Sequence, residues 1–208
     1  MAIRAGVTPN RRGVRSRELV LDAAERIMAE HGFDAATLAR VVEEAGIPMS
    51  SVYHYFGSKD GILLAVMERG ADRFFADLPE RNRRTGRPAE HLARVVSDVV
   101  RALERHPDFL RLLIVFAAQP PAAGDGQVRT VVRRVRRQAL ERLRAQLAIA
   151  FGDDPHSPTT DQLARFALAA IDGAVVATHA DRGVTLERLL RPLAPALVAS
   201  RRALAQAG

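Results

Sequence analysis

The chain has 208 residues, a formal net charge of +7 and no cysteine, which excludes disulfide bonds and thiolate metal sites. The N-terminus lacks the apolar core and cleavage site of a signal peptide, and no uninterrupted apolar run approaches the ~18–20 residues that span a bilayer. We therefore expect a cytoplasmic protein with no membrane partner. The net charge is no evidence for nucleic-acid binding, because residues 1–60 hold eight basic and eight acidic side chains.

Residues 1–15 have no helical period, and we expect them to form a flexible basic arm. Five arginines precede Glu18 with no acidic residue among them. Such an arm can reach a minor groove or phosphates, or it can be a disordered tail with solubilising charge. The first helix is expected from Ser16 to about His31, and Gly32 ends it. Its buried stripe would consist of Val20, Ala23, Ala24, Ile27 and Met28.

The next segment predicts two short helices joined by a tight turn. Residues 37–59 read TLARVVEEAGIPMSSVYHYFGSK. Thr37 is a good N-cap for the first helix, Gly46 stands where the chain must turn, and Pro48 suits the start of the second. Ser50 or Ser51 could cap that second helix instead. Two short helices around a glycine-containing turn form a helix-turn-helix.

The second of these helices, residues 49–56, has two distinct faces. Val52 and Phe56 would anchor it in the core. The outward row is small, polar or aromatic and holds no carboxylate, so it can enter a major groove without repelling phosphates. This row consists of Met49, Ser50, Ser51, Tyr53 and His54.

The run AGIPMSSVYHYFGSKDGIL resembles the DNA-binding signature of the tetracycline-repressor (TetR) family of bacterial transcription regulators. The residues that carry the resemblance are Gly32, Phe33, Thr37, Ala45 to Ile47, Ser51 to Tyr53, Tyr55, Phe56 and Lys59. It implies that Tyr53 and His54 contact phosphate or sugar, and that Ser51 and Met49 approach base edges. Lys59 lies in the first turn of the following helix, where a nearby phosphate would offset its unfavourable position. The DNA-binding residues implied by the signature and the helix pattern are Thr37, Pro48, Met49, Ser50, Ser51, Tyr53, His54 and Lys59.

The chain departs from the family pattern at two positions. Val42 stands where the family usually has alanine, so the two helices are expected to pack slightly wider apart. Met49 replaces a more commonly polar residue, which changes the contacts open to the recognition helix. A methionine there can touch a thymine methyl group.

Every later segment also has a helical pattern. Further helices are expected over residues 60–78, 109–118, 128–151 and 159–182. Another helix is expected where Leu92 to Leu103 form an apolar stripe, and the last one is expected to begin at Thr185. Residues 79–88 read as an arginine-rich linker. Pro192 and Pro195 predict a kink or break in the last helix. The fold class is therefore all-α with about nine helices: a helix-turn-helix domain over residues 16–60 and a helical-bundle domain for ligand binding and dimerisation over 61–208.

The bundle domain is expected to bury its apolar stripes and leave its charges in water. We place Asp98 on the polar face of its helix, and we expect seven arginines of the 128–151 helix to form a solvated face. They are Arg129, Arg133, Arg134, Arg136, Arg137, Arg142 and Arg144.

The family binds a small-molecule effector within this domain, and aromatic and aliphatic side chains here would line such a pocket. The candidates are Phe74, Val95, Val99, Phe109, Leu113 and Phe116. The 159–182 helix is rich in small residues and the next one in leucine, so we expect a two-fold homodimer through both. Its interface residues would be Gly173, Ala177, Leu189, Leu193 and Leu197.

These features predict a ligand-responsive regulator, most simply a repressor that binds a near-palindromic double-stranded DNA operator as a dimer and is released by a small, largely apolar molecule. We expect no cofactor, metal or catalytic residue, since the histidines form no ligand pair and no nucleophile motif occurs. The alternatives are an all-α enzyme and a ligand-independent DNA-binding protein. For the enzyme, the best candidates are Asp172 and His179, which share one helix face and could carry out acid–base chemistry.

Overall fold

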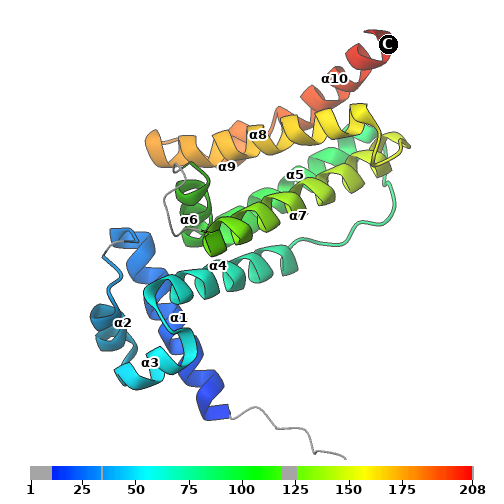
Figure 1. Cartoon of the computed structure of the whole chain (residues 1–208). Coiled ribbons are helices and arrows are strands. Elements are labelled where there is room, and N and C mark those ends of the chain that lie inside the picture. Colours follow the sequence, from blue (N-terminus) through cyan, green and yellow to red (C-terminus); the bar gives the residue numbers. More distant parts are fainter. Residues whose placement is uncertain (1–10, 34, 119–125, 208) are drawn as a thin grey trace, which may run out of the picture. The chain divides into compact units, whose positions relative to one another are not determined.

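The structure is a computed structural model that describes residues 11–33, 35–118 and 126–207. Over these residues the chain forms ten α-helices and no strand, which confirms the all-α prediction (Figure 1). The helices are α1 (Arg11–His31), α2 (Leu38–Ala45), α3 (Met49–Phe56), α4 (Lys59–Ala76), α5 (Pro88–Arg105), α6 (Pro107–Ala118), α7 (Gly126–Phe151), α8 (Pro158–Ala180), α9 (Leu186–Leu190) and α10 (Leu193–Ala207).

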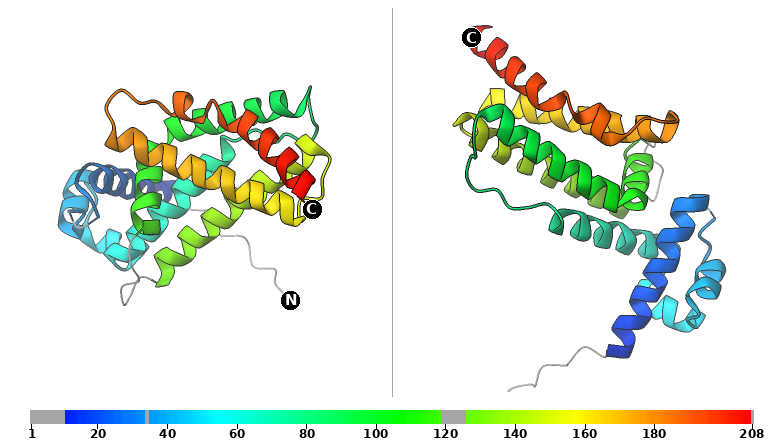
Figure 2. Two further views of the ribbon diagram at one scale, coloured as in Figure 1. Left: turned by 90° about the horizontal axis from the view of Figure 1, so that it is seen from above. Right: turned by 180° about the vertical axis from the view of Figure 1, so that it is seen from behind.

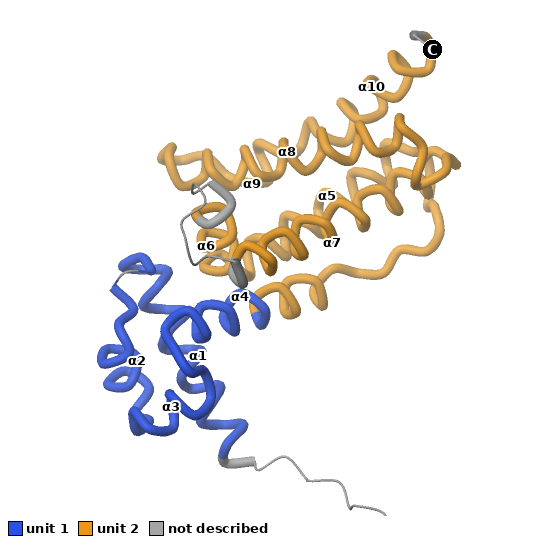
Figure 3. The backbone as a smooth tube through the Cα atoms, in the orientation of Figure 1, with its two compact units in different colours: residues 1–69 blue, residues 70–208 orange. Residues whose placement is uncertain are grey.

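The chain divides into two compact units, residues 1–69 and 70–208 (Figure 3). The division falls inside α4, whereas the sequence placed the domain boundary near the beginning of this helix. Ile62, Leu63, Val66 and Met67 are buried in the first unit, and Phe74 and Phe75 are buried in the second. One helix therefore supplies core residues to both units.

The first unit is built on α1, which contacts both α2 and α3. The predicted stripe of α1 is correct: its five members are at most 3% exposed. The expected start of this helix at Ser16 is wrong, because α1 already begins at Arg11. Residues 1–10, which hold most of the predicted basic arm, lie outside the described residues.

The link between α3 and α4 depends on a glycine. Ser58 caps α4, since its hydroxyl accepts the Gly61 N–H at 3.1 Å. A β-carbon at Gly61 would stand 2.0 Å from the backbone carbonyl oxygen of Phe56. Only glycine fits this position without moving the end of α3.

In the second unit, α7 is the central helix and contacts α5, α6 and α8 (Figure 1). Helix α10 packs along α5 and α8 (Figure 2). The predicted break at the C-terminal prolines is confirmed, because α9 ends at Leu190 and α10 begins at Leu193. Pro195 is accommodated in the first turn of α10, where a missing N–H costs little.

Among the described residues, α8 is the one helix whose length and composition would allow it to cross a membrane. The core helix of a soluble bundle passes the same test. Helix α8 contacts α6, α7, α9 and α10, and we interpret it as a bundle helix.

Candidate DNA-binding surface and ligand cavity

The turn between α2 and α3 has the geometry that its residues predict. The Thr37 hydroxyl accepts the Arg40 N–H at 3.3 Å and so caps α2. Gly46 has φ +63°, a left-handed conformation that glycine adopts at little cost. Pro48 precedes α3 as its N-cap residue, with no side-chain capping bond, so neither Ser50 nor Ser51 acts as the cap.

Helix α3 presents most of the predicted outward row to solvent. Val52 is fully buried, as is Val41 of α2, and the two helices are in contact. On the opposite side, Tyr53 is 52% exposed and Met49 36% exposed. Pro48, Ser50 and His54 are also exposed, while Ser51 is half-buried. The outward row of α3 thus carries no carboxylate, lysine or arginine.

Two aromatic rings hold cations at the edges of this surface. The Lys59 ammonium lies 4.0 Å from the centroid of the Phe33 ring, and the Arg17 guanidinium lies 5.5 Å from the centroid of the Phe56 ring. Both contacts are cation–π interactions that restrict the long side chains. The Phe33 ring therefore keeps the Lys59 ammonium near the first turn of α4. Nothing in the sequence pattern pointed to these two pairings.

Three carboxylates of α1 bind one arginine of α4. Arg69 lies 2.9 Å from Glu18, 2.7 Å from Asp22 and 2.5 Å from Glu25. Burial opposes the charge of Arg69, but the hydrogen bond to Glu18 and the charge of Glu25 raise its pKa above the ordinary value. Arg17 also lies 3.8 Å from Glu18. The ion pairs of Arg69 join α1 to α4 within the first unit.

The second unit contains a cavity of about 390 Å³, within the range of ~300–1,000 Å³ that is usual for ligand pockets. Five of the six predicted pocket residues line it: Phe74, Val95, Val99, Phe109 and Leu113. The side chain of the sixth, Phe116, lies outside the described residues. The apolar walls come from α4, α5, α6, α7 and α8.

The polar part of the cavity wall was not predicted. The segment after α4 contributes Glu80, Arg81 and Asn82, and α5 contributes Asp98. Asp98 is only 5% exposed, so its predicted place on a solvent-facing side of α5 is wrong. Arg81 lies 2.6 Å from its carboxylate, and Arg101 also pairs with it. A helical pattern cannot reveal this site, because a linker arginine neutralises the buried charge.

A second set of hydrogen bonds joins the segment after α4 to α7 and α5. Gln146 donates from Nε2 to the Arg81 carbonyl oxygen at 3.1 Å, and its Oε1 lies 3.3 Å from Nε2 of His91. His91 is fully buried, and its Nδ1 has no partner among the described residues. Burial lowers the pKa of His91 below its ordinary value, and the nearby charges of Arg81 and Arg94 act in the same direction. His91 is therefore neutral near pH 7 and donates from Nε2.

The α7 arginines do not form a single solvated face, as the sequence suggested. Arg136 pairs with Asp172 of α8 at 2.8 Å, and Arg144 pairs with Asp161. Arg142 is half-buried, and its guanidinium lies 5.1 Å from the centroid of the Phe75 ring. Arg136 and Arg142 both line the cavity. Three of the seven arginines thus join α7 to its neighbours.

The residues of the enzyme alternative are engaged elsewhere. Asp172 accepts the hydrogen bond from Arg136, and His179 Nδ1 lies 2.8 Å from the Val175 carbonyl oxygen one turn earlier. Neither contact involves the other member of the pair. This arrangement gives no support to acid–base chemistry by these two residues.

The predicted dimer residues fall into two groups. Gly173 is exposed, and Ala177 and Leu189 are half-exposed. Leu193 and Leu197 are 5% and 3% exposed because they pack inside the unit, where they line a small apolar gap with Leu92 and Leu147. These two leucines are therefore corrected from interface to core residues, since a partner subunit cannot reach them.

The first unit has the arrangement of a helix-turn-helix DNA-binding unit. Helix α2 is capped, a left-handed turn follows it, and the short helix α3 has one face in the buried core and one exposed face without carboxylate, lysine or arginine. Fold and site together define a DNA-binding transcriptional regulator with a separate helical domain. Residues 20–66 match the model of the bacterial regulatory proteins of the tetR family. This match assigns residues 20–66 to the DNA-binding domain of that family.

Comparisons over more of the chain agree with this assignment. The chain is 28% identical over 163 residues to the HTH-type transcriptional regulator BetI of Brucella anthropi, which covers 78% of this chain and 80% of that protein. It is 36% identical over 73 residues to the HTH-type transcriptional repressor AcnR of Corynebacterium glutamicum, covering 35% and 37% of the two chains. The fold is similar to that of the regulator FadR from Bacillus subtilis in complex with stearoyl-CoA, with a TM-score of 0.67, 20% identity and coverage of 88% and 98%.

Proposed function

We propose that the protein is a homodimeric repressor that binds a near-palindromic operator in the cytoplasm and leaves it when a small, largely apolar molecule occupies the cavity. The observation that carries the proposal is the position of α4. Its first turn holds Lys59 next to the helix-turn-helix, and Phe74 and Phe75 near its other end line the cavity. A similar FadR structure contains stearoyl-CoA, and AcnR is named a repressor, which supports both parts of the proposal.

The coupling follows from this shared helix. A ligand that fits the cavity better in one position of Phe74 and Phe75 favours one position of α4, and so changes the geometry of the recognition surface. It can do so only by its differential affinity for the two states. A coupling free energy of ~1–3 kcal/mol would change operator affinity roughly 5–150-fold.

The dimer proposal has its support in an exposed stripe on α8. Phe166 and Val176 are 46% and 49% exposed, and Ala169 and Gly173 lie exposed between them at helical spacing. Large apolar side chains beside small ones suit close packing of two copies around a two-fold axis. Two recognition helices would then reach successive major grooves of one operator.

Gel-shift titration against operator and scrambled duplexes tests the DNA-binding residues. Tyr53→Ala and Lys59→Ala should weaken binding to both duplexes, because phosphate contacts are not sequence-specific. Ser51→Ala should change preference at one or two base pairs only. Wild-type binding by the Tyr53→Ala, Lys59→Ala double variant would contradict the proposed surface.

The ligand response is tested separately with Val99→Trp, which fills the cavity. A compound found by thermal-shift screening should weaken operator binding of the wild type. The variant should still bind the operator but no longer respond to the compound. Its operator affinity should be lower than that of the wild type if the tryptophan mimics the ligand, and unchanged if the tryptophan only blocks the cavity. A ligand that binds the second unit tightly yet leaves operator affinity unchanged would disprove the coupling.

A further inference from the structure

The charged residues of the cavity wall are not equally neutralised. Arg81 pairs with Asp98, and Arg136 pairs with Asp172. Within the part of the chain that the structure describes, Arg142 is the cavity-lining cation that pairs with no carboxylate. It is half-buried, so water screens its charge less than it would on the open surface.

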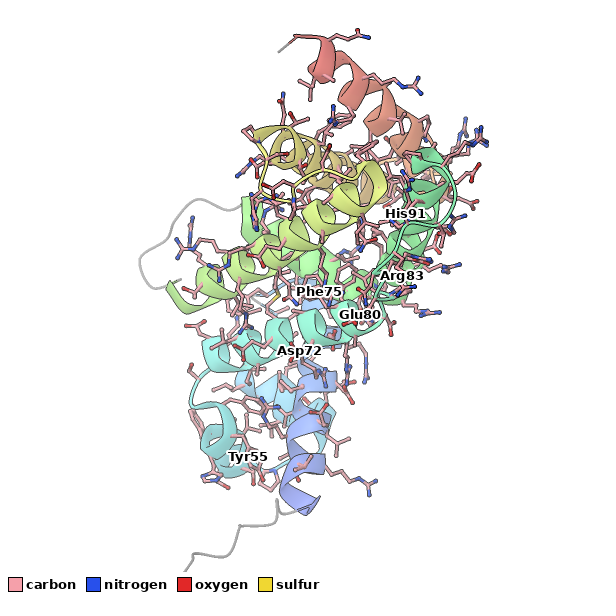
Figure 4. All side chains as sticks on the ribbon, turned by 90° about the vertical axis from the view of Figure 1, so that its right-hand side faces the viewer. Tyr55, Asp72, Phe75, Glu80, Arg83 and His91 are labelled. Carbon is pink, nitrogen blue, oxygen red and sulfur yellow. The ribbon has the colours of Figure 1, made fainter. Side chains whose placement is uncertain are left out.

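The contact of Arg142 with Phe75 leaves a specific set of donors available. The guanidinium carbon lies 5.1 Å from the ring centroid, and Phe75 is itself 5% exposed and lines the cavity. Figure 4 shows Phe75 near the end of α4 and Glu80 on the segment that follows. An arginine held against a ring face keeps its in-plane N–H groups, which form a fork that matches a carboxylate or phosphate. No acceptor on the described residues occupies this fork.

The two carboxylates at the cavity, those of Glu80 and Asp98, are less available to a ligand than the Arg142 guanidinium. Glu80 also lines the cavity and has no ion-pair partner within the described ranges, but its side chain is exposed and therefore well solvated. Asp98 is buried but already carries two arginines. A cationic ligand would thus find only a hydrated carboxylate, whereas an anionic ligand finds a partly desolvated, oriented guanidinium.

The rest of the wall determines the other end of the ligand. Phe74, Phe109, Leu110, Leu113 and Val135 are each at most 9% exposed and offer carbon surface alone. We infer that the cavity takes an amphipathic anion, an apolar chain or ring system with one carboxylate or phosphate group that Arg142 binds. This inference rests on the proposed function, and it narrows the effector from a largely apolar molecule to an apolar acid.

The test compares four ligands with the same apolar chain: decanoate, decyl phosphate, decanol and decylamine. Their affinities for the full-length protein are measured by calorimetry below the concentrations at which they form micelles. The wild type should bind decanoate, decyl phosphate or both at least about tenfold more tightly than decanol, as expected for a hydrogen bond to a charged group. The ratio of the first two affinities distinguishes a carboxylate site from a phosphate site.

Variants of Arg142 assign the preference to this residue. Arg142→Gln should bind the two anions no more tightly than decanol, whereas Arg142→Lys should retain part of the preference. Arg133→Gln, on the exposed side of the same helix, is the matched control and should behave as the wild type does. Equal binding of decanoate and decanol by the wild type, an unchanged preference in Arg142→Gln, or tighter binding of decylamine would each overturn the inference.

Failure of this inference and failure of the proposed function give different results. If Val99→Trp abolishes binding of all four ligands and none prefers an anion, the cavity binds apolar molecules and only the role of Arg142 is wrong. If Val99→Trp leaves binding of every ligand unchanged, the cavity is not the ligand site, and both proposals fail.

Discussion

Gly70 lies against the ring of Phe109 so closely that a β-carbon at residue 70 would stand 2.4 Å from Phe109 Cδ2. The absence of a side chain at Gly70 thus allows α4 to approach α6 at one end of the cavity wall. Phe109 is 1% exposed, so its ring has little room to move away.

The first prediction concerns this contact. Gly70→Ala should lower the free energy of unfolding by about 1–3 kcal/mol, the usual cost of overpacking, despite alanine's higher helix propensity. The measurement is urea unfolding of the wild type and variant. The double variant Gly70→Ala, Phe109→Leu should be more stable than the sum of the single changes predicts, because the smaller side chain relieves the clash. Simple additivity would show that the ring is not the obstacle.

The second prediction concerns the link between α3 and α4. A β-carbon at Gly61 would meet the backbone oxygen of Phe56 at 2.0 Å, and backbone cannot move as cheaply as a side chain. Gly61→Ala should therefore destabilise the first unit by at least about 2 kcal/mol and reduce operator affinity. Ser58→Ala, which removes only the cap of the same helix, should cost about 1 kcal/mol. A Gly61→Ala protein as stable as the wild type would contradict the geometry of this link.

The third prediction concerns the dimer. Apart from its chain neighbours and the backbone of its own helix, no atom of the described residues lies within 4 Å of a β-carbon built at Gly173, so a side chain there starts into open space. Gly173→Leu should give monomer in analytical ultracentrifugation by separating the two α8 helices, and Phe166→Arg should have the same effect by placing charge in the interface. Ala93→Leu, on the exposed side of α5, is the control and should leave the oligomeric state unchanged. Dimers from both α8 variants would rule out this interface.

The fourth prediction concerns pH. The folded-state pKa of His91 lies below the unfolded value of ~6.5, so the unfolded chain binds more protons as the pH falls. The free energy of unfolding should therefore decrease from pH 7.5 to pH 5.5, by up to ~1.4 kcal/mol per pH unit. His91→Gln should show a flatter dependence, whereas His156→Gln, an exposed histidine, should follow the wild type. Identical slopes for the wild type and His91→Gln would show that another group titrates.

The helix-turn-helix could be predicted almost completely because its determinants are local. Thr37, Gly46 and Val52 each act within a few residues of themselves, through a cap, a turn and a helix face. The apolar cavity residues could be predicted for a similar reason, since helical spacing shows which side chains point inward. The corrected positions depend on tertiary contacts. Leu193 and Leu197 packed into the subunit because α10 lies against α5 and α8, which no pattern within one helix reveals.

The polar side of the cavity could not be predicted. Asp98 has the spacing of a surface residue, and its buried charge is neutralised by Arg101 on the same helix and by the linker residue Arg81. Arg142 belongs to a run of arginines that looks uniform in sequence, yet its contact with Phe75 on α4 separates it from the exposed Arg133 and Arg137. Such pairings join residues far apart in the chain, and one sequence does not show which charges meet.

The sharing of α4 between the two units limits how this protein can be engineered or recombined. A chimera that exchanges the regulatory domain by cutting between Arg69 and Gly70 would keep Gly70 with Phe109, but it would divide a continuous helix. A junction in the segment between Ala76 and Pro88 would keep α4 whole, but it would transfer Phe74 and Phe75 into a foreign core. The incoming α6 would then need to place no bulkier side chain than phenylalanine opposite Gly70. Recombination within this fold should therefore succeed most often when α4 and α6 are inherited together.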